Sequence, residues 1–505
     1  MGLYDFTFYD MIGRNAALFG DRPAWIELET GEQTSFAAIR TEVDRLAAGL
    51  ADCGLARGQR IGVLAQNSLA YFLLYGAAAA LGAIVVPINW RLSVEEVCFN
   101  LADTGPIILA ADAAYQEMLD VNQEKLPTVR HRFGLSRDGF WPALDTVKAD
   151  ADQVFPPPAV SEDDGLVIIH TAAVAGRPRG ALLSHANLLC ANLHWQCRLQ
   201  ISPEDVHLNL LPLFHVGGLF MAASSFHAGA LNVNLRKFEA ATAAEAIERY
   251  KATVMFDFSP ILGNILDVPG RDLGSLRAVT GLDTPGTIER YQQRTGGTFY
   301  AMYGQTETAC IATYGRYDDR PGAAGRPISL ADLRLLDEHD RPVSTGQVGE
   351  IAMRGPMVFK GYWNLPEDNA YTFRDGWHHT GDLGRFDADG FLWYAGRKAD
   401  KELIKPGGEN VYPAEVEKAI LAHPAVVGAV VFGVPDPKWK EGIKAVCVLV
   451  PGASLSAGEL IDFVGGKIAR YKKPQYVEFV EDLPRDKEGR PDRQRIKEIY
   501  GGPQG

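Results

Sequence analysis

The chain has 505 residues, of which 47% are hydrophobic and 22% are charged, so length and composition favour a globular protein of two or more domains. Its 50 Lys+Arg against 63 Asp+Glu give a formal net charge of −13, which disfavours non-specific binding to nucleic acid or anionic membranes. The six scattered cysteines indicate free thiols in a reducing compartment rather than a disulfide framework or a zinc site. An N-terminus that carries acids where a signal peptide is basic agrees with a cytoplasmic location.

The first 270 residues alternate helical and strand patterns, which predicts a parallel sheet with helices on both faces. We interpret apolar runs as strands at 60–65, 83–88, 107–111, 165–170 and 252–258, with helices at 36–53 and 240–250. The uncharged stretch 69–88 is long enough to span a bilayer. Gly76, Gly82 and Pro87 favour instead a buried helix followed by a strand.

From about Pro321 to Trp393 the helical periodicity disappears and short strands alternate with Gly, Asp and Pro turns, which predicts a β-rich subdomain at about 321–396. After Gly396 the pattern is again mixed, with helices expected at 414–426 and 458–469 and strands at 427–434 and 443–450. The fold class we expect is therefore α/β. A large N-terminal domain (1–396) of parallel or mixed sheets flanked by helices precedes a small α+β domain.

Five short motifs carry the chemistry, and they are HTAAVAGRPRG (170–180), YGQTE (303–307), HTGDL (379–383), GRKADKELIKPGGENVYPAEVE (396–417) and LPRDKEGR (483–490). In the first motif, Gly176 and Gly180 let backbone N–H groups point at an anion, and Arg177 and Arg179 add positive charge. A surface loop with solvated arginines is an equally good interpretation of that motif alone.

In YGQTE, an aromatic ring at the end of an apolar strand can stack on a base, Thr306 can donate to a phosphate, and Glu307 is a hard ligand suited to Mg²⁺. A polar loop that closes a strand is the plainer alternative. Asp382, in a tight turn, can accept both ribose hydroxyls. Arg397 can reach the same sugar or the α-phosphate, since a guanidinium suits bidentate anion contacts.

Together with LPLFHVGG (211–218), GYWNLPEDN (361–369) and VFGVPDPKWKEGIKAVCVL (431–449), these motifs resemble the ANL superfamily of adenylate-forming enzymes over essentially the whole chain. The resemblance is strongest to the AMP-forming acyl-CoA synthetases. It implies that a carboxylic acid and MgATP form an acyl-adenylate, from which coenzyme A then displaces AMP. It also implies a hinge at 397–401 and a mobile C-terminal lid domain at 402–505.

The resemblance implies roles for individual residues. Tyr303 would stack on adenine, Thr306 would bind the α-phosphate and Glu307 the metal ion. Asp382 and Arg397 would hold the ribose. Further nucleotide contacts would fall on Thr171, Gly176, Arg177, Arg179, Gly180, Gly281, Leu282, Asp283, Met302, Gly304 and Gln305, and coenzyme A contacts on Gly407, Gly408, Glu409 and Trp439.

His215 resembles the residue beside the acyl pocket that opens or closes the path of the carboxylate, although a satisfied core histidine is the alternative. The candidate pocket lining is His194, Phe214, Val216, Gly217, Phe256, Phe258 and Ala301. This lining is apolar and moderately bulky, so it disfavours acetate and dicarboxylates.

The chain departs from the family pattern in three places. Ala172–Ala175 replace residues that are usually Ser, Thr or Gly, and each lost hydrogen bond to a phosphate would weaken binding by about 1.5–3 kcal/mol. Arg490 stands where the family has a catalytic lysine, and it keeps the positive charge on a larger guanidinium group whose N–H donors point in other directions. Lys487 is an alternative donor. Two extra residues after Arg397 leave the pivot open among Ala399, Asp400 and Lys401.

The leading hypothesis is an AMP-forming acid–thiol ligase that uses ATP, Mg²⁺ and coenzyme A on a hydrophobic or aromatic carboxylic acid. The catalytic residues would be Thr306, Glu307, His215 and Arg490. Two alternatives are an acyl-AMP ligase that loads a carrier protein and a nucleotide-binding protein without turnover. A homodimer is the default expectation for the oligomeric state.

Overall fold

The computed structural model describes residues 5–150, 156–174, 177–398, 403–406, 411–437, 439–485 and 491–502. The chain divides into two compact units. The larger unit comprises Met1–Trp90, Leu101–Ile169 and Gly180–Gly396, and the smaller one Arg91–Asn100, His170–Arg179 and Arg397–Gly505.

A nine-stranded sheet forms one half of the larger unit, and its strands follow the order β15-β14-β13-β12-β11-β9-β10-β1-β2. Their bounds are β1 Pro23–Glu27, β2 Gln33–Ser35, β9 Val206–Asn209, β10 Leu231–Asn234, β11 Val254–Phe258, β12 Ala278–Leu282, β13 Thr298–Tyr303, β14 Thr313–Arg316 and β15 Arg326–Pro327. The strands from β13 to β1 run parallel, and β14, β15 and β2 are antiparallel at the two edges. The expected parallel sheet is therefore present, with antiparallel margins.

A second, seven-stranded sheet has the order β18-β8-β7-β4-β3-β5-β6. Its strands are β3 Arg60–Leu64, β4 Ile84–Pro87, β5 Ile108–Ala111, β6 His131–Gly134, β7 Gly165–Val174, β8 Arg177–Ser184 and β18 Gly361–Tyr362. β4 and β5 are buried at every residue, as expected for parallel strands covered on both faces. β7 continues to Val174 and β8 begins at Arg177, so the strand predicted to end at residue 170 is four residues longer than expected.

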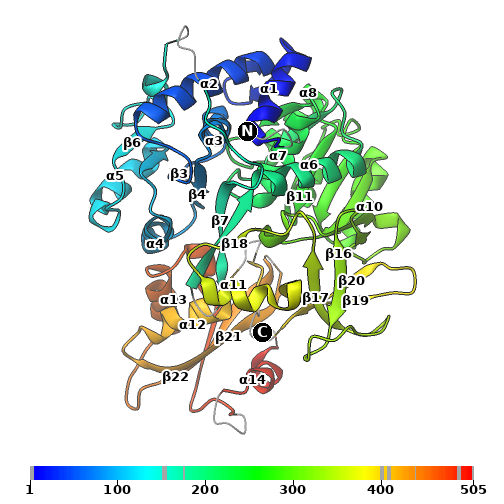
Figure 1. Cartoon of the computed structure of the whole chain (residues 1–505). Coiled ribbons are helices and arrows are strands. Elements are labelled where there is room, and N and C mark those ends of the chain that lie inside the picture. Colours follow the sequence, from blue (N-terminus) through cyan, green and yellow to red (C-terminus); the bar gives the residue numbers. More distant parts are fainter. Residues whose placement is uncertain are drawn as a thin grey trace. The chain divides into compact units, whose positions relative to one another are not determined.

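Helices cover these sheets, and the helices of the larger unit are α1 Phe8–Phe19, α2 Phe36–Asp52, α3 Leu69–Leu81, α5 Ala113–Val121, α6 His185–Leu199, α7 Val216–His227, α8 Ala240–Tyr250, α9 Ile261–Leu266, α10 Pro285–Thr295 and α11 Pro366–Thr372. α4 Val94–Thr104 begins in the segment assigned to the smaller unit. α1, α2 and α3 pack against one another (Figure 1).

The helix α3 accounts for the first part of the apolar stretch 69–88. The Ser68 side chain caps its N-terminus by accepting from the N–H of Tyr71, and Gly82 ends it in the left-handed conformation at φ 65°. Phe72 of α3 stacks on Trp25 of β1 with ring centroids 4.9 Å apart, so the helix is a core element of the larger unit. Among the described residues, no helix combines the length and apolar character needed to cross a membrane.

A four-stranded antiparallel sheet, β16-β17-β19-β20, occupies the region predicted to be β-rich. Its strands are β16 Asp332–Leu336, β17 Gly349–Arg354, β19 His378–Phe386 and β20 Leu392–Arg397. The register of β17 against β19 shifts between Glu350, which pairs with Leu383, and Ala352, which pairs with His379. Residues 380–382 therefore form a bulge opposite Ile351.

The smaller unit contains the sheet β21-β22-β23 and the helices that cover it. Its elements are α12 Pro413–Leu421, β21 Val426–Asp436, β22 Lys440–Leu449, α13 Ala457–Gly465, β23 Tyr476–Val480 and α14 Arg493–Tyr500. α13 ends at Gly465 rather than at the predicted residue 469, because two glycines in succession, Gly465 and Gly466, disfavour helix continuation.

His185 and His207 are buried in the larger unit, and His227 is half-buried there. Burial lowers the pKa of His185, His207 and His227 from the usual value near 6.5 to about 4, because an imidazolium loses its hydration there. His207 Nδ1 also lies 2.8 Å from Asn232 Oδ1 inside the core.

Between about pH 6.5 and pH 4 the folded chain binds fewer protons at these histidines than the unfolded chain does, so we expect the free energy of unfolding to fall as the pH falls through that window. The measurement is urea unfolding from pH 7.5 to pH 5. His207→Gln should flatten the dependence, whereas His339→Gln, at a side chain that is 64% exposed, should leave it unchanged. Equal slopes in all three proteins would contradict this assignment.

Candidate active site

The carboxyl ends of the parallel strands β11, β12 and β13 lie at one edge of the nine-stranded sheet. Phe258 pairs with Leu282, and Gly281 pairs with Ala301 on the next strand. Because ligands of open α/β sheets bind at such edges, the register brings the predicted adenine segment beside the YGQTE motif. Of the predicted nucleotide residues, Gly281, Leu282, Met302 and Tyr303 all come from this edge.

Gly281 has no room for a side chain. Its φ of 143° lies outside the range that L-residues usually adopt, and a Cβ atom there would lie 1.9 Å from the carbonyl oxygen of Asp257. Glycine thus allows β12 to approach β11 closely at the point where the strand ends.

The YGQTE motif continues β13 into a short 3₁₀ helix, Thr306–Thr308. The N–H of Gln305 donates to the hydroxyl of Thr308 at 2.9 Å, which fixes the start of this turn. Glu307 is only 7% exposed, and its Oε1 accepts a hydrogen bond from the Tyr362 hydroxyl at 2.9 Å. One bond at one oxygen leaves the carboxylate with acceptor capacity for a cation, so the geometry is compatible with the predicted metal ligand.

Asp382 joins this motif to the HTGDL motif of β19. Its Oδ2 accepts from the Tyr303 hydroxyl at 2.8 Å and from the Gln305 amide, and its Oδ1 lies 3.4 Å from the Tyr394 hydroxyl. The side chain is 1% exposed, so these donors satisfy a carboxylate that has lost its hydration. Two predicted nucleotide-binding motifs, more than seventy residues apart in sequence, therefore meet at one buried carboxylate.

An aromatic cluster lies at the end of β11. Phe256 and Phe258 have ring centroids 5.1 Å apart, and the His215 ring meets Phe258 edge-on at 5.6 Å. His215 caps α7, because its Nδ1 accepts the N–H of Gly217 at 3.2 Å. The neutral ring then carries its proton on Nε2. A Cβ at Gly217 would lie 3.4–3.6 Å from these three rings, so the glycine borders the same cluster.

The remaining candidates for the acyl pocket differ in their surroundings. Phe214 and Val216 are buried on either side of His215 in sequence, and Ala301 is half-buried in β13. His194 is also buried, but its Nδ1 is 2.8 Å from the carbonyl oxygen of Cys190 in its own helix. Its neighbour Trp195 is the residue of α6 whose ring meets Phe256, edge-on at 5.7 Å.

Sequence reasoning missed Trp195, Tyr362 and Tyr394. The signal for Trp195 is a single indole in an otherwise polar turn of helix 185–199, but the rotation of the helix decides whether it or His194 faces β11. Tyr362 belongs to the GYWNLPEDN motif, and no local pattern links it to Glu307, which lies 55 residues earlier.

Gly180, Asp283, Gly304 and Thr306 also lie in the larger unit, and the smaller unit holds Thr171, Arg179, Arg397 and Trp439. The Thr171 hydroxyl donates to the carbonyl oxygen of Arg179 at 3.3 Å, and the Arg397 guanidinium donates to the Tyr412 hydroxyl at 2.9 Å. The Trp439 side chain is exposed, and its backbone N–H donates to Asp436 at 2.7 Å. For Arg177 the structure describes the backbone only. The remaining candidates lie outside the described residues, and they are Gly176, Ala399, Asp400, Lys401, Gly407, Gly408, Glu409, Lys487 and Arg490.

Comparison with known proteins decides the family. The model described as "AMP-binding enzyme" matches residues 12–363, and the model described as "AMP-binding enzyme C-terminal domain" matches residues 415–490. The chain belongs to the AMP-binding enzyme family. The predicted membership of the ANL superfamily is therefore confirmed, within its AMP-forming acyl- and aryl-CoA ligases.

Relatives of this AMP-binding enzyme have several different names. An indoleacetate–CoA ligase of Aromatoleum aromaticum is 34% identical over 92% of the chain and 93% of its own length. A fatty acid–acyl-carrier-protein ligase of Streptomyces coeruleorubidus is 31% identical over 94% and 92%. The structure of a double mutant of the o-succinylbenzoate CoA synthetase of Bacillus subtilis, bound with a product analogue, matches with a TM-score of 0.87 at 27% identity over 99% of both chains.

We expect Asp382→Asn to weaken MgATP binding about 10- to 100-fold, because a neutral amide replaces a charged acceptor at which each hydrogen bond contributes about 1.5–3 kcal/mol. Isothermal titration calorimetry measures the affinity. Asp387→Asn is the matched control, since that aspartate follows the same strand and bonds to Trp393. Unchanged affinity in Asp382→Asn would remove this carboxylate from the nucleotide site.

Proposed function

We propose that the chain is an AMP-forming acid–coenzyme A ligase whose substrate is a hydrophobic or aromatic carboxylic acid. The observation that carries this proposal is the position of the His215, Phe256 and Phe258 rings. They lie at the end of β11, one strand from Gly281–Asp283, the predicted adenine segment. An acid bound against these rings would have its carboxylate next to a nucleotide held at the same edge.

In the first step, a carboxylate oxygen of the substrate attacks the α-phosphorus of ATP and pyrophosphate leaves, which yields an acyl-adenylate. Thr306 would donate to the α-phosphate, and Arg490 would supply the cation that offsets charge at phosphorus. Glu307 would ligate Mg²⁺, which neutralises phosphate charge when it is bound. In the second step, the sulfur of coenzyme A attacks the acyl carbon, AMP leaves with the bonding electrons, and the thiol proton is lost to solvent.

Asp382, Tyr303 and Gln305 would position the nucleotide during the first step. The Asp382 carboxylate is already oriented by the Tyr303 hydroxyl, so binding of a ribose would require little reorganisation of its side chain. The segment 397–401 would be the hinge about which residues 402–505 turn before coenzyme A enters, and the two family models match on either side of it.

The acceptor can also be a carrier protein, as the name of the Streptomyces coeruleorubidus relative indicates for that enzyme. Trp439 favours coenzyme A, because its exposed indole can stack on the adenine of that molecule. Mass spectrometry of the product formed with coenzyme A, or with a phosphopantetheinylated carrier protein, separates the two acceptors.

With MgATP and coenzyme A, we expect pyrophosphate release with arylacetic, cinnamic and medium-chain acids, at a kcat/KM at least about 10-fold above that for acetate or succinate. Burial of an apolar group against the aromatic rings stabilises binding, whereas burial of a second carboxylate there is unfavourable. A coupled pyrophosphate assay over this panel measures the ratio. A preference for acetate or a dicarboxylate would contradict the proposed substrate class, and no product with any acid would support binding without turnover.

Arg490→Ala should abolish acyl-adenylate formation and leave the reaction of preformed acyl-adenylate with coenzyme A largely intact, because the cation acts at phosphorus in the first step only. Arg490→Lys should restore adenylation, since lysine keeps the charge. Equal loss in both half-reactions of Arg490→Ala would reject the role.

A further inference from the structure

We propose that Glu350 is a positioning residue, which holds the bulge 380–382 in the shape that presents the Asp382 carboxylate to the ribose of the nucleotide. This inference rests on the proposed function, because it concerns the same nucleotide site. Glu350 lies on β17, the strand that pairs with β19 beside the bulge, so it would act through the turn.

The first contact is between Glu350 and the backbone of the bulge. Gly381 has the left-handed φ of 73°, and its N–H points at Glu350 Oε1, 2.9 Å away. The register of β17 and β19 is shifted at this point. In a regular strand pair the N–H of Gly381 would bond to a backbone carbonyl of the neighbouring strand, but here it bonds to the Glu350 carboxylate instead. Glu350 therefore sets the orientation of the Thr380–Gly381 peptide group, one peptide before the group that joins Gly381 to Asp382.

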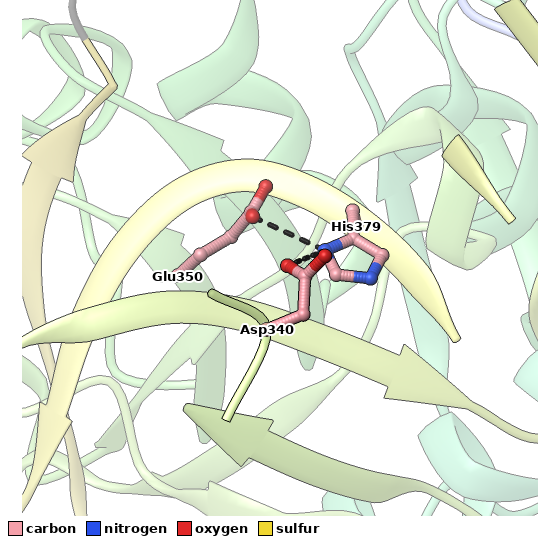
Figure 2. A group of neighbouring side chains, drawn as sticks. All are labelled: Asp340, Glu350 and His379. Atoms are coloured by element: carbon pink, nitrogen blue, oxygen red, sulfur yellow. Dashed lines mark hydrogen bonds and ion pairs between the residues drawn. The ribbon is translucent and has the colours of Figure 1, made fainter. Parts of the chain in front are cut away.

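The other oxygen of Glu350 is held by two side chains. Oε2 lies 3.1 Å from His379 Nδ1 and 3.3 Å from the Arg374 guanidinium. Figure 2 shows the carboxylates of Glu350 and Asp340 both directed at the same ring nitrogen of His379. Since the Glu350 side chain is 3% exposed, these contacts replace its lost hydration and fix its rotamer.

A metal site is the competing interpretation of this cluster, because ligand atoms of Asp340, Glu350 and His379 lie within 4.8 Å of one another. The Arg374 guanidinium already supplies positive charge to the two carboxylates of this cluster. It bonds to Asp340 at 2.8 and 2.9 Å as well as to Glu350, and this hydrogen bonding holds the pKa of Asp340 below its usual range. If His379 Nδ1, the nitrogen nearest both carboxylates, donates its hydrogen to Glu350, that nitrogen has no lone pair for a metal. The contacts favour a rigid support.

The bulge transmits this support to Asp382. The Thr380 hydroxyl donates to the carbonyl oxygen of Ile351 at 2.6 Å and accepts the N–H of Asp382 at 3.1 Å. Glu350 and Thr380 thus hold the two peptide N–H groups of Gly381 and Asp382 in succession. If the first is lost, the Asp382 side chain remains bonded to Tyr303 but its backbone can rotate, which moves the carboxylate relative to a bound sugar.

Glu350→Gln tests this inference with little change of shape. The amide oxygen can still accept from Gly381, whereas the NH₂ group then faces the two donors on His379 and Arg374, so the carboxamide must shift. We expect the affinity for MgATP to fall about 10-fold. Asp332→Asn is the matched control, because that carboxylate pairs with Arg354 on the same sheet at the surface.

The decisive readout compares ATP with 2′-deoxy-ATP and 3′-deoxy-ATP by calorimetry. In the unmodified chain and in Asp332→Asn the deoxy analogues should bind more weakly, and in Glu350→Gln this preference for ATP should largely disappear. General damage would weaken all three nucleotides equally, and a retained preference in Glu350→Gln would overturn the inference. His379→Gln provides a second, milder variant with the same expected direction should Glu350→Gln fold poorly.

Binding measurements also separate this inference from the proposed function. If no carboxylic acid yields an acyl-adenylate with the unmodified chain, the proposed ligase activity fails. The discrimination between ATP and its deoxy analogues still reports whether Glu350 supports Asp382.

Discussion

A single buried carboxylate links the two sheets that carry the nucleotide motifs. Asp382 comes from the bulge of the four-stranded sheet, and its partners Tyr303 and Gln305 come from the end of β13 in the nine-stranded sheet. A buried carboxylate is stable only when donors surround it, so the two sheets can separate only at a cost of several kcal/mol. The relative placement of the YGQTE and HTGDL motifs within the larger unit depends on this contact.

The same constraint explains why polar residues accumulate around the site. Tyr362 bonds to Glu307, Glu350 bonds to Gly381, and Arg374 forms ion pairs with both Glu350 and Asp340. Each of these groups satisfies another that burial would otherwise leave without a partner. The residues that are expected to touch the nucleotide are thus held by supporting residues from other segments. Glu350 lies on β17, Tyr362 on β18 and Arg374 on the 3₁₀ helix Arg374–Gly376.

Much of the fold follows from local sequence patterns. The helix predicted at 36–53 is α2, Phe36–Asp52, and the helix predicted at 240–250 is α8, with identical bounds. The strands at 60–65 and 107–111 are β3 and β5, because β-branched runs bounded by polar turns have few other stable conformations. The predicted family and fold class are confirmed.

The site could be predicted only where the signal lies in one short segment. The motifs predict Tyr303, Glu307 and Asp382 as site residues, but no spacing rule connects Glu350 with Gly381 across a register shift. The choice between His194 and Trp195 required the rotation of α6, which depends on packing rather than on sequence periodicity. The roles of Arg490 and of Gly407–Glu409 stay predictions from sequence.

The crowding at Gly281 has a practical meaning for attempts to alter which acids the enzyme accepts. Saturation mutagenesis at this codon would return almost solely misfolded clones, because every side chain collides with the Asp257 carbonyl. Gly217 is the better starting point, since a methyl group there reaches ordinary van der Waals contact with three rings. Randomising position 217, alone or with Ala301, would change the packing of this aromatic cluster, which we propose as the acyl site, and would leave Gly281 of β12 unchanged.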